Sequence, residues 1–475
     1  MPKKKKETKT EELFAEYPNL YMEASSDDID AAFAFADEYK AFLDISKTER
    51  EFARNAIATA EDLGYKDISG VDTLKAGDKV YTSIKGKGFA AAVIGKKPVT
   101  EGFNILGAHI DSPRLDLKPN PVYEDSDTVY FKTHYYGGIK KYQWTTIPLA
   151  VHGVVYTTDG KCHEICVGEK PEDPVFYISD LLPHLDGEQM NKKASELIPA
   201  EDLNVIIGGI PLKDKDLSEP YKAAILKLLN SEYKITEKDF VSAEIEIVPA
   251  AKARDLGFDR ALIAAYGHDD KVCAFPALMA LMAQEKPSRT CVTILTDKEE
   301  IGSYANSGAQ SVLYENFLME LLAKSCGGVD SFNMLTFRKA MAGTKMLSTD
   351  VTTAYDPKYA SVFEKRNTAY LSHGLKLEKY TGARGKSGSS EANGDFVAQI
   401  TDIFAKNSIP WQTGELGKID AGGGGTISCY MAKLGMDVID CGVPVLSMHA
   451  PVEVISKIDL YYLYLGYKAF IENIR

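Results

Sequence analysis

The chain has 475 residues, a length that predicts two or three domains rather than one simple core. Hydrophobic residues make up 45% and charged residues 26%, the balance of an ordinary globular protein, which excludes a fibrous or disordered chain. The net charge of -13 argues against nucleic acid as the main partner, because binding its backbone requires a cationic surface.

The apolar runs and the cysteine pattern indicate the compartment in which the protein is expected. No run of about 18 apolar residues occurs, so no membrane span is expected. A lysine run at residues 3–6 has no apolar stretch of the signal-peptide kind after it, and we interpret it as a solvated terminus. The seven cysteines are odd in number, widely spread and without a Cys-x-x-Cys pair, which predicts a reducing cytoplasm.

The N-terminal part of the chain predicts two helices followed by strands. Apolar residues recur at helical spacing over 29–43, and Ser46 with Glu49 predicts a capping-box start for a second helix that ends before Gly64. Strands are then predicted at 80–84, 89–94 and 103–109. The last is almost continuously apolar, as a buried strand is, and it ends at a histidine.

Residues 119–255 differ from their flanks and predict an inserted β-rich domain. A Thr-Asp-Gly turn at 158–160 lies between two β-rich runs, which is a hairpin signal. A polar, helix-prone stretch occupies 213–238, before an alternating strand. The flanking segments, 1–118 and 256–475, then form the two parts of one domain.

Beyond this insertion, strands and helices alternate. Strands are predicted at 261–265, 292–296, 345–348 and 438–440, and helices at 270–284, 312–323, 396–406, 427–434 and from 459. Such alternation predicts an α/β fold with a mainly parallel sheet and helices on both faces.

Five side chains of metal-ligand type follow predicted strands or begin a helix. In a wound α/β sheet the carboxyl ends of the strands lie along one edge, so residues distant in sequence converge there. Two histidines and three carboxylates suit zinc, manganese or cobalt. The set is His109, Asp269, Glu300, Asp350 and His449.

Each of these fragments alone has an ordinary structural explanation. His-x-Asp occurs by chance, an aspartate at a helix start is usually an N-cap, and adjacent glutamates usually form a solvated first turn. At like topological positions they together favour a metal centre. Asp111, two residues after His109, would accept the other imidazole N–H, while Glu299 and Glu300 would point to different targets, one to water and one to metal.

Other candidates carry less weight. The remaining histidines are expected to be core or surface residues, with His268 the most suspect because it abuts Asp269. The stretch 382–387 lacks the first glycine of a phosphate-binding loop, since Tyr380 stands in its place. We interpret the run of glycines that includes Gly423 as a wall of the substrate site, with an anion cradle at a helix start or a tight turn as the alternatives.

These residues together resemble a known family, the aspartyl aminopeptidases, which are cocatalytic zinc exopeptidases, and in particular its bacterial branch. The resemblance covers nearly the whole chain and is strongest at 107–113, 136–139, 257–270, 299–303, Asp350 and 446–449. It implies a zinc exopeptidase-like fold with two divalent ions per chain, Zn2+ first and Mn2+ or Co2+ as alternatives.

The family's roles map onto this sequence residue by residue. Asp269 would bridge both ions, His109 and Asp350 would complete one site, and Glu300 and His449 the other. Glu299 falls on the family's general base.

The resemblance also implies a homo-oligomer. The run Leu-Leu-Pro-His-Leu-Asp at 181–186 places His184 where the family supplies a histidine to a neighbouring subunit's active site. In this family the β-rich insertion mediates dimerisation, and dimers assemble into a dodecamer.

Two departures bear on specificity. Thr353 stands where the family usually has a substrate-contacting histidine, which leaves the preference for acidic N-terminal residues open. Lys379 matches the family's substrate-carboxylate lysine only if one residue is inserted before Ser387.

The predicted function is hydrolysis of the N-terminal peptide bond of peptides. A metal-bridging hydroxide would attack, Glu299 would act as general base, and His184 of a neighbour would hydrogen-bond the oxyanion. One alternative is another dinuclear metallohydrolase, a deacylase or carboxypeptidase. A second is a non-catalytic, metal-stabilised assembly protein, which should lack a base such as Glu299.

Overall fold

The structure, a computed structural model, describes residues 13–475, so the lysine run at 3–6 lies outside it. A main sheet of nine strands has the order β1-β2-β3-β13-β4-β14-β20-β16-β18, and its central strands β13, β4, β14 and β20 run parallel. The bounds in sheet order are β1 Lys66–Asp67, β2 Lys79–Ile84, β3 Gly88–Val93, β13 Thr290–Thr296, β4 Phe103–His109, β14 Lys345–Thr349, β20 Asp437–Gly442, β16 Leu375–Glu378 and β18 Trp411–Thr413.

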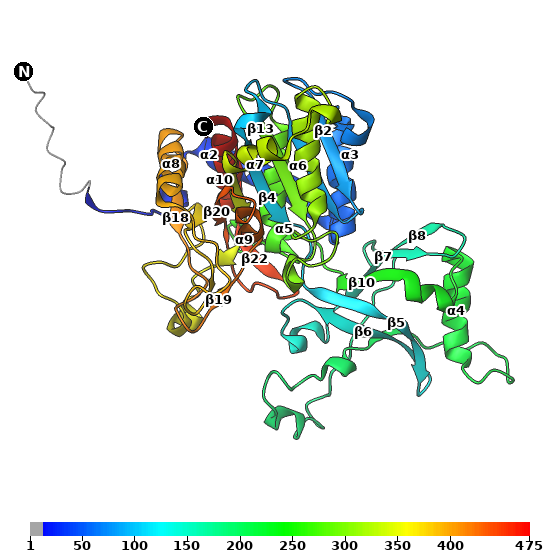
Figure 1. Cartoon of the computed structure of the whole chain (residues 1–475). Coiled ribbons are helices and arrows are strands. Elements are labelled where there is room, and N and C mark those ends of the chain that lie inside the picture. Colours follow the sequence, from blue (N-terminus) through cyan, green and yellow to red (C-terminus); the bar gives the residue numbers. More distant parts are fainter. Residues whose placement is uncertain (1–12) are drawn as a thin grey trace, which may run out of the picture.

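Helices cover both faces of the main sheet, as the alternation predicts (Figure 1). One face packs against α2 (Ser26–Asp44), α3 (Glu49–Asp62), α5 (His268–Met282), α8 (Gly394–Lys406) and α10 (Lys457–Asn473). The other packs against α6 (Val312–Ser325), α7 (Met334–Ala342) and α9 (Ser428–Ala432). Successive side chains of a strand point to opposite faces, so Leu106 of β4 lies in the first core and Ile105 in the second.

A second sheet, called the small sheet below, has six antiparallel strands in the order β8-β7-β10-β5-β6-β9. It has its own hydrophobic core and carries α4, and it projects from the main body (Figure 1). Its elements are β5 Arg114–Asp125, β6 Thr128–Tyr136, β7 Leu149–Tyr156, β8 Cys162–Val167, β9 Val205–Gly208, α4 Pro220–Tyr233 and β10 Ala243–Pro249.

The remaining regular elements are short. They are α1 Leu20–Glu23, the three-stranded sheet of β11 Arg254–Leu256, β12 Leu262–Ala265 and β22 Glu453–Ser456, and the pairs β15 Thr352–Thr353 with β21 Pro444–Val445 and β17 Gly382–Ala383 with β19 Gly423–Gly424. No helix within residues 13–475 has both the length and the apolar character needed to cross a membrane.

The start of the second helix differs from the sequence prediction. The capping box of α3 is formed by Thr48 and Glu51, not by Ser46 and Glu49. Ser46 is buried and accepts a hydrogen bond from Asn55, and Glu49 is buried in an ion pair with Arg114, so neither side chain is available to cap. Pattern reasoning from the sequence also missed α7 and β22 and, within the main sheet, β1, β16 and β18.

Candidate metal centre

The five predicted ligands lie together at the carboxyl edge of the main sheet. His109 ends β4, Glu300 follows β13, and Asp350 follows β14. Asp269 lies in the first turn of α5, and His449 lies in the loop between β21 and β22 with a φ of 65°. A left-handed backbone at a non-glycine residue costs energy and persists only where the surrounding structure holds it.

Asp269 stands between the two histidines. Its Oδ1 lies 3.2 Å from His109 Nε2, and its Oδ2 lies 3.3 Å from His449 Nε2. Asp350 Oδ1 is 3.9 Å from His109 Nε2, and Glu300 Oε2 is 3.4 Å from His449 Nε2. The side chains therefore form two groups of three that share Asp269, and the ligand atoms of each group lie within 4.8 Å of one another.

The other imidazole nitrogens are held by oxygen atoms. His449 Nδ1 donates to the carbonyl oxygen of Gly138 at 2.8 Å, and His109 Nδ1 lies 3.1 Å from the Asp111 carbonyl and 3.2 Å from the Asp111 carboxylate. Both Nε2 atoms thus face the carboxylates, the orientation that a metal-ligating imidazole requires.

Asp111 also fixes the segment that carries the two glutamates. Its Oδ1 accepts the backbone N–H of Glu299 at 3.1 Å, and its Oδ2 accepts that of Glu300 at 3.2 Å and the hydroxyl of Tyr136 at 2.7 Å. Burial alone would raise the pKa of Asp111, but hydrogen bonds from His109 and Tyr136 hold it at about 2. Asp111 is therefore an ionised acceptor that sets the positions of neighbouring groups.

A second positioning carboxylate was missed by the sequence reasoning. Glu453 accepts the backbone N–H of His449 at 2.7 Å and that of Asp269 at 3.0 Å, so one side chain ties two predicted ligands together. Ser112 donates to the carbonyl oxygen of Asp269 at 2.6 Å and accepts from Lys271 at 2.6 Å. The only signal in the sequence for these roles is closeness to a predicted ligand; Glu453, for example, lies four residues after His449.

The charges of the cluster fit a cation site. Burial raises the pKa of Glu300 and of Asp350 well above the usual range, and neighbouring carboxylates add to the shift. Glu300 Oε1 is buried without a hydrogen-bond partner. Several carboxylates that converge in one buried place are stabilised in their charged form by metal cations, and the oxygen and imidazole donors suit zinc.

A cleft of about 610 Å³ opens over this cluster. It is lined by all five predicted ligands, by Glu299 and by Gly423. Thr353, Lys379 and His184 do not line it, although Thr352 and Glu378 do. His184 is exposed in the long connection between β8 and β9.

His268 is a core residue, in line with the default expectation for the other histidines. Its Nδ1 bonds the Tyr39 hydroxyl at 2.9 Å, and its Nε2 lies 3.3 Å from the carbonyl oxygen of Ile263. Burial lowers the pKa of His268 to about 3, which keeps its ring neutral in the core, and His268 does not line the cleft.

Comparison with known proteins extends over almost the whole chain. The family model described as aminopeptidase I zinc metalloprotease (M18) matches residues 42–471. A probable M18 family aminopeptidase 1 from Clostridium acetobutylicum is 51% identical over 466 residues, which is 97% of this chain and 99% of that one.

Solved structures agree with the fold. The crystal structure of an M18 family aminopeptidase from Thermotoga maritima has a TM-score of 0.93 at 42% identity and covers 97% of this chain and 100% of its own. A solved S. cerevisiae mApe1 dodecamer has a TM-score of 0.74 at 19% identity over 92% of this chain and 96% of that chain, a likeness of fold.

Proposed function

Because the chain belongs to the aminopeptidase I zinc metalloprotease family (M18) and is a metalloaminopeptidase, we propose that its cleft holds two divalent cations and releases N-terminal residues from peptides. The observation that carries the proposal is the position of Asp269, whose two carboxylate oxygens face two different imidazoles at 3.2 and 3.3 Å. A carboxylate in that position would be shared between the two ions.

The two ions would have three protein ligands each. His109, Asp269 and Asp350 would hold one, and Asp269, Glu300 and His449 the other. Three ligands leave open positions on each ion, which is typical of catalytic rather than structural zinc sites. The donor set favours zinc and also accepts manganese or cobalt.

Glu299 is proposed as the general base. When bound, the ions would lower the pKa of water and polarise the scissile carbonyl. The Glu299 carboxylate accepts the proton of the attacking water and later passes it to the leaving amine. Burial raises the pKa of Glu299 to about 7, which suits a group that both accepts and donates a proton near neutral pH.

Asp111 supports this step through the backbone of Glu299 and Glu300 rather than by touching the substrate. Its two oxygens accept both backbone N–H groups, so the base and a metal ligand are held in one rigid segment. Asp111 is therefore proposed as a positioning residue.

Substrate selection is proposed to involve the wall that contains Gly423, together with Thr353 and Lys379 at its margin. A neighbouring cleft of about 460 Å³ shares Gly423 with the first and is lined by three cations, Arg384, Lys386 and Lys418, and by three carboxylates, Glu378, Glu415 and Asp420. Because these charges balance, the proposed preference for acidic N-terminal residues, aspartate or glutamate, rests on the family resemblance and is decided by the substrate assay.

The active form is proposed to be a homo-oligomer built from dimers, with residues 119–255 as the dimerisation domain between catalytic segments 1–118 and 256–475. The connection that carries His184 exposes several apolar side chains, among them Leu182 at 48% and Leu185 at 68%. Exposed apolar residues in one segment are typical of a surface covered by a partner. A dodecamer would match the named assembly of the yeast protein.

His184 of a neighbouring subunit would then donate a hydrogen bond to the oxyanion of the substrate. The working compartment is proposed to be the cytoplasm, because the odd and scattered set of seven cysteines does not suit an oxidising one.

The test combines metal analysis with substrate profiling. Metal-stripped enzyme is reconstituted separately with Zn2+, Mn2+ and Co2+ and assayed on aminoacyl substrates that differ only in the N-terminal residue. We expect about two ions per chain, as a cocatalytic pair requires, with cleavage confined to substrates that carry a free α-amine. One ion per chain at full activity would contradict the dinuclear site, and cleavage of N-acylated substrates would contradict the aminopeptidase assignment.

A further inference from the structure

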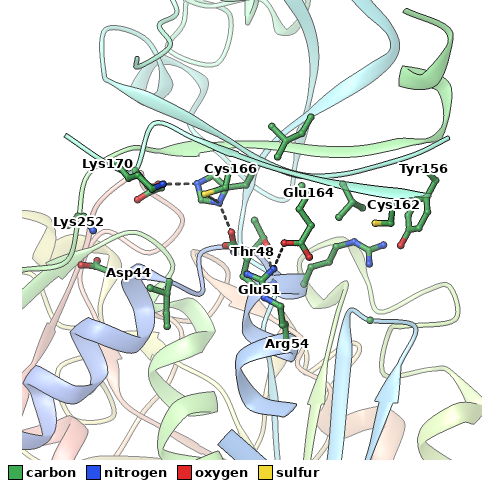
Figure 2. A pocket seen from close by; sticks show the side chains of 18 residues that line it. Asp44, Thr48, Glu51, Arg54, Tyr156, Cys162, Glu164, Cys166, Lys170 and Lys252 are labelled. Atoms are coloured by element: carbon green, nitrogen blue, oxygen red, sulfur yellow. Dashed lines mark hydrogen bonds and ion pairs between the residues drawn. The ribbon is translucent and has the colours of Figure 1, made fainter. Parts of the chain in front are cut away.

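A second cluster of metal-ligand side chains lies where helix α3 meets the hairpin of β7 and β8. Glu51 of α3, His152 of β7 and Cys166 of β8 bring one ligand atom each to within 4.8 Å of one another. His152 Nδ1 lies 2.7 Å from Glu51 Oε1 and 3.8 Å from Cys166 Sγ. Figure 2 shows Glu51 and Cys166 approaching each other across the boundary between the helix and the small sheet.

The backbone fixes this arrangement. His152 and Cys166 are directly paired residues of the antiparallel β7–β8 ladder, so their side chains share one face of the sheet. Glu51 is held by the capping box of α3, in which its Oε2 accepts the backbone N–H of Thr48 at 3.1 Å. Its Oε1 is thereby left to face His152.

The distances suit tetrahedral zinc. Bonds of about 2.0 Å to nitrogen and about 2.3 Å to sulfur give a nitrogen-sulfur separation of about 3.6 Å, close to the 3.8 Å observed. The corresponding nitrogen-oxygen separation is about 3.3 Å, so Glu51 Oε1 would move away from His152 by about half an ångström on binding. A glutamate side chain makes such a movement by a small torsional change.

Glu169 completes the environment of the imidazole. His152 Nε2 lies 3.0 Å from Glu169 Oε1, which also accepts from Lys47 at 2.6 Å. A carboxylate on the far nitrogen orients a metal-ligating histidine and fixes its tautomer. Glu169 Oε2 is buried without a hydrogen-bond partner, so this oxygen can still accept a hydrogen bond next to the cluster.

We propose that Glu51, His152 and Cys166 form a separate, mononuclear zinc site that clamps the small sheet to the main body. The cleft beside it, of about 470 Å³, leaves the fourth position open to water. No residue that lines this cleft also lines the catalytic one. Binding releases the thiol proton of Cys166 and the Nδ1 proton of His152 to solvent, and no redox step is involved.

The sulfur ligand lets absorption spectroscopy distinguish this site from the catalytic centre. Cobalt bound to a thiolate absorbs in the near ultraviolet, whereas the histidine and carboxylate ligands of the catalytic cleft do not give this band. Cys429 lines the catalytic cleft, so the test is done on the full chain with Cys429→Ser. Metal-stripped protein is titrated with Co2+.

We expect the band in the Cys429→Ser chain and its loss when Cys166→Ser is added. Cys162→Ser is the matched control, because Cys162 lies four residues away on the same face of β8 and lines the same cleft. It should keep the band. Asp269→Ala should keep it too, which separates this proposal from that of the catalytic centre.

Three results would overturn the site. They are no band in the Cys429→Ser chain, a band that survives Cys166→Ser, and a band that disappears with Asp269→Ala.

Alkylation gives a second, independent readout. Both thiols are exposed, so both should react with iodoacetamide in the metal-free chain. Saturating Zn2+ should slow modification of Cys166 by at least about tenfold, because a coordinated thiolate is withheld from the reagent, and should leave Cys162 unchanged. Equal rates for Cys166 with and without zinc would contradict the proposal.

Discussion

Replacing Asp111 by asparagine tests whether one buried carboxylate holds the proposed catalytic segment in place. Four polar groups face its two oxygens: His109 Nδ1 and the Glu299 N–H on Oδ1, and the Glu300 N–H and the Tyr136 hydroxyl on Oδ2. Asparagine keeps only one oxygen, and its amide N–H groups would face donors on the other side.

The cost follows from which donors lose their acceptor. If the amide oxygen accepts the Glu299 N–H, the Glu300 N–H is left without an acceptor. If the amide is turned the other way, the Glu299 N–H is left without one. An unpaired buried donor costs about 1 to 3 kcal/mol, and if the segment leaves its reactive position to recover a partner for that donor, kcat/KM falls by about 5- to 150-fold. Tyr136→Phe removes one donor and keeps the carboxylate, so it should cost about 1 kcal/mol, or about fivefold.

The assay measures kcat and KM for one aminoacyl substrate at saturating metal, with metal content and thermal midpoint recorded for each variant. We expect kcat to fall while KM changes little, because the base is misplaced and the substrate wall is intact. An Asp111→Asn enzyme that retains kcat within twofold at full metal occupancy would refute the positioning role. A loss of activity matched by loss of folded protein would refute it as well, since the effect would then be one of stability.

Three further predictions concern the same cleft. Glu299→Gln should keep its metal and lose activity by about a hundredfold or more, whereas Glu300→Gln should lose metal; metal loss in both would contradict their separate roles. The His184→Phe and Asp269→Ala chains should each be inactive. Co-expression of the two should restore activity, because some intact metal sites then receive His184 from a neighbour. Mixed oligomers that are verified by size and mass and stay inactive would exclude the shared site. The kcat/KM should fall as pH drops, because Glu299 acts as a carboxylate and is protonated at low pH. Burial raises the pKa of Glu299 to about 7 and bound cations lower it again, so the fall should lie below pH 7. This fall should be absent in Glu299→Gln.

The sequence alone determined the central strands of the main sheet and the edge at which the site lies. Runs such as β4 and β13 are buried on both faces, and the helices between the strands cover those faces, so both appear directly as apolar patterns. The carboxyl ends of parallel strands share an edge, which is why side chains as distant as His109 and His449 were expected together.

Only the tertiary structure decided which atoms meet. Contacts between segments more than 100 residues apart place Asp269 between two imidazoles, join the Asp269 N–H to Glu453 and bring Glu51 against His152. No local pattern encodes such contacts. The propensity and periodicity of residues indicate the helix or strand to which they belong, and not the element that packs against it. The same reason explains the misplaced start of α3, since Glu49 is taken out of the cap by Arg114 of the small sheet.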